Sequence, residues 1–181
     1  MSKRKNDLNK RFSQTIQEKR RRHTNANARI CVVFDDIETK LLEHIGDNHC
    51  KYVAILCPYF SNQKILKALS TKDGVSIVTT YDKNLKSKVR TKSFKELSPL
   101  LEDRVRTLNC GTGKSKSIMH SKVIVLLDYE KRPYRAIGGS YNFSGGSETN
   151  IETMTVYDNA VVAKSFYDEF FRVYGISKKY L

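Results

Sequence analysis

Short apolar runs alternate with amphipathic segments along most of the chain. Buried strands are predicted over residues 28–34, 52–60 and 74–82, where the sequence is apolar and rich in β-branched or aromatic residues. Helices are predicted between them, over residues 35–48 and 61–70, with Asp35 or Asp36 capping the first and Ser61 the second. Strand and helix therefore repeat in the order that is typical of a layered α/β domain.

The second half of the chain adds more strands and one long helix. Strands are predicted over residues 105–109, 118–128, 134–139 and 151–157, and an amphipathic helix over residues 158–175, closed by Gly175. A short helix is expected over residues 94–101, within the basic segment 83–104. The predicted fold is α/β, a mixed β-sheet flanked by helices on both faces, in a single domain.

Length and composition support one folded domain. The chain has 181 residues, of which 39% are hydrophobic, which is enough for one buried core. Neither a run of about eighteen apolar residues nor a secretory signal is present, so we expect an intracellular, cytoplasmic protein, nuclear in a eukaryotic host, without a membrane partner. The four cysteines, which we expect to be reduced and packed without a metal or cofactor, are Cys31, Cys50, Cys57 and Cys110.

Positive charge is concentrated at the N-terminus. The chain carries a net charge of +14, and residues 1–29 hold ten Lys or Arg against Asp7 and Glu18, which gives +8 there and leaves +6 elsewhere. Such a basic arm attracts polyanions in a salt-sensitive and sequence-independent way. Nucleic acid is therefore the first candidate partner, with DNA favoured over RNA. The residues of the arm that we expect to contact it are Lys19, Arg20, Arg21 and Arg22.

The same arm carries a narrow apolar stripe. Leu8, Phe12 and Ile16 recur every four residues, so we expect residues 1–29 to be helical and to precede a folded domain over residues 30–181. The stripe is equally compatible with docking on the body of the protein or on a second subunit, with the charges merely solvated. A nuclear address or contact with anionic lipid also stays open.

Two polar residues interrupt the apolar stretch IMHSKVIVLLD, residues 118–128. Side chains alternate along a strand, so His120 and Lys122 are expected to point to the same side. An imidazole beside an ammonium disfavours the charged form of each, unless an anion lies between them, and a phosphate suits both. Taken alone, the pair is also compatible with a core histidine next to a surface lysine.

A second polar cluster follows in GGSYNFSGGSETNIE, residues 138–152. Ser140 and Asn142 lie two apart at a predicted strand end and supply neutral donors that suit phosphate oxygens. Glu152, on a neighbouring strand, is placed to accept a hydrogen bond from His120 and so fix its tautomer. Upstream, Lys114 and Lys116 form either a basic rim that leads to His120 or a plain solvated loop.

These residues resemble the HKD motif of the phospholipase D superfamily. The resemblance rests on His120, Ser121 and Lys122, then Asp128, then Gly139 to Asn142, and finally Glu152, and it covers roughly residues 30–173. It implies the fold of that family and a metal-independent attack of His120 on phosphorus, through a covalent phosphohistidine. It also implies that Lys122, Ser140 and Asn142 bind the phosphoryl oxygens, while Glu152 orients the imidazole.

The sequence departs from the family pattern at two places. Five residues separate Lys122 from Asp128 where the family usually has four, which turns Asp128 to the other strand face and removes it from the predicted site. The spacing from Asn142 to Glu152 is about one residue short, so Asn150 competes with Glu152 for the orienting role. We favour Glu152.

The family builds a complete active site from two such motifs, and one is expected here. The chain is therefore expected to form a homodimer with two copies of His120 facing each other. Small single-motif members of the family are typically nucleases, which favours a nuclease that cleaves nucleic-acid phosphodiester bonds. The alternatives are a lipid phosphodiesterase of the phospholipase D type and a nucleic-acid-binding protein without turnover.

Overall fold

One mixed sheet forms the centre of the protein. The computed structural model describes residues 22–25, 29–80, 105–110, 117–144 and 150–179. In spatial order, the nine strands of the main sheet are β1 (Arg22–Asn25), β2 (Ile30–Val33), β10 (Met154–Tyr157), β9 (Pro133–Gly139), β8 (Val123–Leu127), β3 (Tyr52–Leu56), β4 (Gly74–Thr79), β5 (Val105–Thr107) and β11 (Lys178–Lys179). The neighbours β3, β4 and β5 run parallel, and the other pairs are antiparallel. A separate antiparallel pair joins β6 (Asn109–Cys110) to β7 (Ser117–Ile118).

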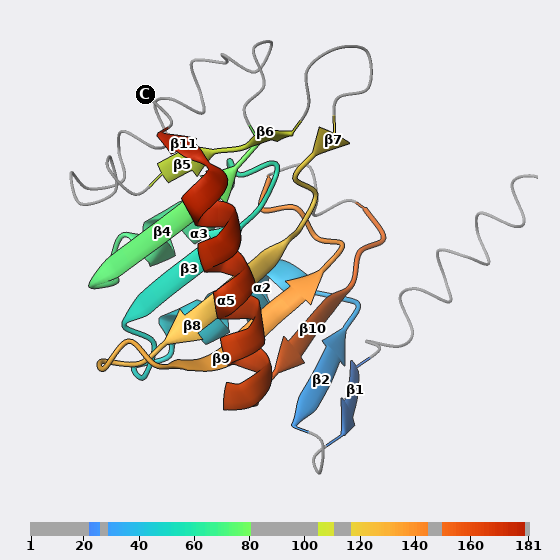
Figure 1. Ribbon diagram of the computed structural model, residues 1–181. Coiled ribbons are helices and arrows are strands. Elements are labelled where there is room, and N and C mark those ends of the chain that lie inside the picture. The colour runs from blue at the N-terminus through green and yellow to red at the C-terminus, as the bar shows by residue number, and fades with distance from the viewer. Residues whose placement is uncertain (1–21, 26–28, 81–104, 111–116, 145–149, 180–181) are drawn as a thin grey trace, which may run out of the picture.

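Helices cover both faces of this sheet. The long helix α5 (Ala160–Ile176) crosses one face over β9, β8 and β3, and α2 (Ile37–Gly46) and α3 (Gln63–Leu69) lie together behind the other face (Figure 1). This arrangement confirms the predicted α/β fold class. No helix in the described part of the chain is long and apolar enough to cross a membrane.

The core has two parts, one on each side of the sheet. On the α2 and α3 side, Leu41 and Ile45 are fully buried against Ile55 of β3, because their helical spacing places both on the inner face of α2. On the other side, Ala163 and Phe170 of α5 pack over the sheet. Burial of each large aliphatic or aromatic side chain stabilises the fold by about 1.5–3 kcal/mol.

Helix boundaries differ slightly from the predicted ones. The side chain of Asn62, not Ser61, caps α3 by accepting hydrogen bonds from the backbone N–H groups of Lys64 and Ile65. At the start of α2, Asp36 occupies the cap position with φ 55° but makes no side-chain capping bond. Helix α5 continues through Gly175 to Ile176, so Gly175 does not close it.

Two predicted elements need correction, and others lie outside the described residues. The strand predicted over residues 118–128 is divided, because β7 ends at Ile118 and β8 begins at Val123, so His120 and Lys122 lie in the connection. Residues 22–25 of the arm form β1, a strand instead of a helix, and pair with β2. The rest of the arm, apart from Arg29, and the predicted helix 94–101 are outside the described residues.

Strand order brings four chain segments to one edge of the sheet. Leu56 pairs with Val123, Val123 with Gly138, and Gly139 with Met154. Because β8 runs antiparallel to β3 and β9, and β9 antiparallel to β10, the start of β8 meets the ends of β3 and β9 and the start of β10. The residues just beyond these strand ends, 57–60, 120–122, 140–142 and 150–153, therefore gather at this edge.

Candidate active site

His120 and Lys122 are in direct contact at this edge. The Lys122 ammonium nitrogen Nζ lies 3.1 Å from Nε2 and 3.4 Å from Nδ1 of the His120 ring, and donates to the His120 carbonyl oxygen at 3.0 Å. Because an ammonium can only donate, the ring nitrogen that accepts from it must carry a lone pair. His120 is exposed, whereas Lys122 is only 7% exposed. A buried cation thus lies beneath an accessible imidazole.

The charge of Lys122 is influenced by two neighbours from other elements. Burial lowers the pKa of its ammonium, and the nearby Cys57 and Glu152 each oppose this effect. Glu152 is partly buried and accepts a long hydrogen bond of 3.4 Å from Asn150 Nδ2. Among the described residues, the Glu152 carboxylate has no hydrogen bond to His120, so its role in orienting the imidazole stays a prediction. Its electrostatic contact is with Lys122.

Ser140 is fixed by the segment that precedes β10. Its hydroxyl oxygen accepts a hydrogen bond from the backbone N–H of Thr153 at 2.9 Å, and its own N–H donates to the Thr153 carbonyl at 3.1 Å. The hydroxyl proton is not used in these bonds and can be donated to a ligand. Thr153 follows Glu152 directly, so the same pair of bonds holds Ser140 and Glu152 at one edge.

Asn142 carries a buried amide oxygen, Oδ1, that has no hydrogen-bond partner in the described part of the chain. Leaving a buried polar atom unpaired costs about 1–3 kcal/mol, so a bound donor is expected to satisfy this oxygen, whereas a phosphate oxygen would accept from the NH₂ group of the same amide. The segment around Asn142 is held firmly, because the next residue, Phe143, is buried and its carbonyl accepts from the backbone N–H groups of Ser61 and Asn62.

Asp128 lies at the other end of β8, in the turn before β9. Its carboxylate accepts from the backbone N–H groups of Glu130 and Arg132 and from Arg132 Nε, each at 2.9 Å. Burial raises the pKa of Asp128, but these hydrogen bonds and the guanidinium charge together lower it by more. The net pKa is therefore below its usual value. Asp128 is therefore at the end of β8 away from His120, in a turn and not on the other face of a strand, and its absence from catalysis stays a prediction.

A second His-x-Lys triplet, residues 49–51, has the same spacing as His120 and Lys122. The expectation that the sequence holds one such pair was therefore wrong. The second triplet precedes β3 and lies at the opposite end of that strand from the site. A five-residue strand spans roughly 17 Å, which keeps the two triplets apart within one chain. Among the described residues, no group of three His, Cys, Asp or Glu side chains is arranged to hold a metal ion.

Two contributors to the site were missed in the sequence. Cys57 was interpreted only as a packed thiol, and Thr153 was not singled out. Their roles depend on which strands lie side by side, which the local sequence pattern does not encode. The predicted nucleic-acid contacts Lys19, Arg20, Arg21, Lys114 and Lys116 lie outside the described residues, and only the backbone of Arg22, in β1, is described.

The gathered side chains provide a cation, an imidazole, a hydroxyl and an amide around one edge, a set that suits an anionic phosphoester. Comparison with known proteins identifies the family of the chain. The family model of the phospholipase D-like domain of cardiolipin synthase matches residues 41–174. An uncharacterized protein of Acanthamoeba polyphaga mimivirus is 23% identical over 185 residues, and the match covers 81% of this chain and 65% of the viral protein's length.

Two solved structures share the fold. NucT from Helicobacter pylori superposes with a TM-score of 0.68 at 19% identity, over 83% of this chain and 98% of its own. Nuc from Salmonella typhimurium, a phospholipase D family member, superposes with a TM-score of 0.63 at 17% identity, over 83% of this chain and 97% of its own. These likenesses extend across nearly the whole of both bacterial chains.

Proposed function

The chain belongs to the phospholipase D-like family, and from this premise we propose that it is a phosphodiesterase that cleaves nucleic acid without a metal ion. One observation supports this proposal above the others. The buried ammonium of Lys122 contacts the exposed ring of His120 at 3.1 Å, at the edge where Ser140, Asn142 and Glu152 also lie. A phosphate bound over this edge meets a nucleophile and several hydrogen-bond donors together.

The proposed reaction has two steps that both centre on His120. In the first, a ring nitrogen of His120 forms a bond to phosphorus while the bond from phosphorus to the leaving oxygen breaks, and the leaving oxygen takes a proton from a general acid. In the second, water gives a proton to the same group, now a base, and attacks phosphorus. The nitrogen–phosphorus bond breaks, and its electron pair returns to the imidazole.

The other polar side chains stabilise the charge that develops in these steps. Lys122, together with the Ser140 hydroxyl and the Asn142 amide, donates to the phosphoryl oxygens. When a phosphate binds, it competes with the His120 ring for the Lys122 ammonium, which uncovers the lone pair needed for attack. Glu152 holds its negative charge near Lys122 and supports the cation.

The general acid is proposed to be His120 of the partner subunit. Of the other histidines with a described backbone, His44 and His49 lie at the opposite end of the sheet, and His23, in β1, is separated from β9 by β10 and β2. A homodimer that brings two copies of the edge together supplies the missing imidazole by symmetry. In this proposal one histidine is the nucleophile in the first step and the leaving group in the second, while the partner's histidine is the acid in the first step and the base in the second.

Nucleic acid is the proposed substrate because of the charge distribution. More than half of the +14 net charge is in residues 1–29, and we propose that the part of this segment before β1 acts as a basic arm that captures the polyanion. Such capture is strongest at low salt and independent of base sequence. The arm then raises the substrate concentration at the edge without taking part in the chemistry.

The proposal is tested by incubating the full chain with labelled single- and double-stranded DNA and RNA in EDTA. Parallel reactions use vesicles that contain cardiolipin or phosphatidylcholine. We expect cleavage of nucleic acid that is lost, by roughly a thousandfold or more, in His120→Ala. Headgroup release with intact nucleic acid would instead select a lipid phosphodiesterase, and salt-sensitive binding without any cleavage would select a binding protein.

The dimeric site has a test of its own. Wild-type protein is mixed in equal amounts with His120→Asn and allowed to exchange subunits. A site that needs both histidines retains about a quarter of the activity, because only wild-type pairs work, whereas independent subunits retain about half. Sedimentation before and after mixing checks that the variant still assembles.

A further inference from the structure

Cys57 lies next to Lys122 of the candidate site, at the end of the adjacent strand. The last paired residues of β3 and β8 are Leu56 and Val123, so the next residues beyond that pair are Cys57 and Lys122. Figure 1 shows β3 and β8 side by side, with these two ends at the same edge. Directly opposed residues of antiparallel strands have Cβ atoms about 4.5–5.5 Å apart, with both side chains on one face. The thiol and the ammonium therefore point to the same side.

The thiol is held in a fixed position. Cys57 is 0% exposed and belongs to the core on the α2 and α3 side of the sheet, together with Ile124, which lies two residues after Lys122. Its Sγ donates to the carbonyl oxygen of Tyr59 at 3.1 Å, and its backbone N–H donates to Val78 at 3.1 Å. With its proton directed to Tyr59, the sulfur can act toward its other neighbours only as an acceptor.

Lys122 needs such neighbours because it is buried. The groups that face its ammonium are His120 from its own segment, Cys57 from the end of β3 and Glu152 from the segment before β10. Burial lowers the pKa of Lys122, and Cys57 and Glu152 each raise it. Glu152 is only partly buried, so water weakens its effect. The Cys57 sulfur is 0% exposed and lies opposite Lys122, so water does not compete with it as an acceptor for the ammonium.

We propose that Cys57 is a positioning residue for Lys122: the buried sulfur, opposite the lysine in the β3–β8 ladder, holds its ammonium charged and directed to the edge where a phosphoester binds. This inference rests on the proposed function for its consequence in catalysis. Its structural content, the influence of Cys57 on Lys122, is independent of any activity. The thiol stays reduced, and no bond to it forms or breaks.

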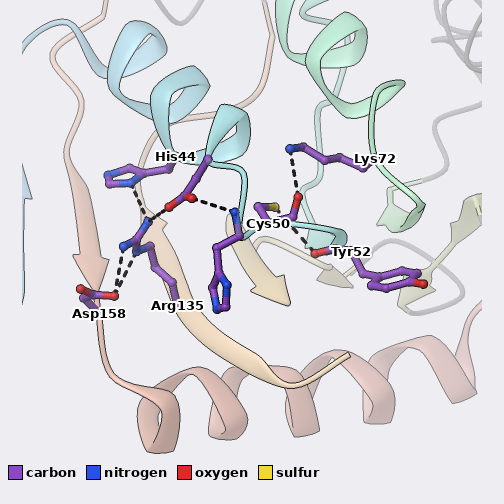
Figure 2. Close-up of polar contacts among 8 residues, drawn as sticks. His44, Cys50, Tyr52, Lys72, Arg135 and Asp158 are labelled. Atoms are coloured by element: carbon purple, nitrogen blue, oxygen red, sulfur yellow. Dashed lines mark hydrogen bonds and ion pairs between the residues drawn. The ribbon is translucent and has the colours of Figure 1, made fainter. Parts of the chain in front are cut away.

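The same strand offers a matched control. Cys50 lies two residues before β3 and is as deeply buried as Cys57, in the same core cluster, but at the opposite end of the sheet. Figure 2 shows the surroundings of Cys50. The Cys50 Sγ donates to the Tyr52 carbonyl at 3.9 Å, and Lys72 Nζ donates to the Cys50 carbonyl at 3.1 Å. Cys50→Ala therefore removes a buried thiol without altering the site.

The test is an NMR titration of Lys122 in full-length protein with isotope-labelled lysine side chains, its signal assigned by its loss in Lys122→Arg. We expect the pKa of Lys122 to be lower in Cys57→Ala and in Cys57→Val than in wild type, because neither side chain offers a lone pair. Alanine leaves a cavity at this buried site, whereas valine overfills it by about one methyl group, so a shift common to both variants comes from the lost sulfur and not from packing. Cys57→Ser and Cys50→Ala should titrate like wild type.

The outcomes separate this inference from the proposed function. A Lys122 titration that is the same in Cys57→Val as in wild type overturns the inference, whether or not the protein cleaves nucleic acid. A lower pKa of Lys122 in Cys57→Val supports the inference even if the wild type cleaves nothing. The absence of cleavage would contradict the proposed function alone. Where cleavage is measured, the alkaline limb of the pH–rate profile should move to lower pH in Cys57→Val and stay in place in Cys50→Ala.

Discussion

The backbone of Gly139 lies so close to the carbonyl group of Thr153 that a Cβ atom at position 139 would overlap with it. This contact joins the end of β9 to the segment that enters β10, next to the two hydrogen bonds between Ser140 and Thr153. Glycine is therefore required at position 139 by close approach of two backbones, and this approach sets the position of Ser140.

Gly139→Ala should consequently reduce both stability and cleavage. The methyl group must displace backbone atoms, which cannot rotate away, so we expect the free energy of unfolding to fall by about 1–3 kcal/mol. Urea unfolding and initial cleavage rates measure the two effects. The control is Gly138→Ala, whose Cβ meets the Lys122 carbonyl oxygen at 3.7 Å, an ordinary contact. Equal losses in the two variants would contradict this explanation.

Asp128→Ala should lower stability without slowing cleavage. The Asp128 carboxylate accepts three hydrogen bonds in the turn between β8 and β9, far from the candidate site. Its pKa is below the usual value in the folded protein, so its stabilising effect is present above the unfolded pKa, near pH 3.8, and is lost as pH falls through the lower folded value. The difference from wild type in urea unfolding should therefore shrink in acid. A large loss of kcat in a folded variant would instead assign Asp128 to catalysis.

His44 should make stability depend on pH between neutral and mildly acidic conditions. Its Nδ1 lies 3.2 Å from Arg135 Nη1, and Arg135 also pairs with Asp158 (Figure 2). Asp47 forms a further ion pair with Arg135. Burial, followed by the charge of Arg135, lowers the pKa of His44 in the folded protein. The unfolded chain then takes up a proton near pH 6.5 that the folded protein resists, so the free energy of unfolding falls as pH decreases below that value.

Urea unfolding over this pH range compares wild type with His44→Gln, which should show a flatter dependence. His49→Gln serves as the control, because His49 is an exposed histidine at the same end of the sheet. If His44→Gln keeps the full pH dependence of wild type, the contact between His44 and Arg135 is not its source.

Local sequence pattern was sufficient for most of the fold. The buried residues Leu41 and Ile45 follow helical spacing, and the apolar run of β3 has the composition of a strand covered on both faces, so these elements could be predicted. Boundaries were less accurate where neighbouring residues compete. Ser61 and Asn62 are both good caps, and Asn62 has an additional hydrogen bond, from its Nδ2 to Glu38, which holds it in the cap position.

The candidate site was only partly accessible from the sequence. The spacing of His120 and Lys122 indicated a shared direction, and their contact agrees with it, but not through strand alternation, because β8 begins at Val123. The contributions of Cys57 and Thr153 depend on the pairing of β3 with β8 and on the approach of β9 to the start of β10. Those relationships join residues far apart in the sequence, and no local pattern of polar and apolar positions specifies them.

Direct detection of the covalent intermediate tests the central claim that His120 is the nucleophile. The full chain, in EDTA, is mixed with nucleic acid that carries ³²P at its internal phosphates and is quenched rapidly at alkaline pH, where phosphohistidine survives. We predict labelled protein, acid-labile, with the label mapped to His120 and absent from a folded His120→Asn variant. Cleavage by wild type without a labelled adduct, or with the adduct retained in His120→Asn, would contradict the account.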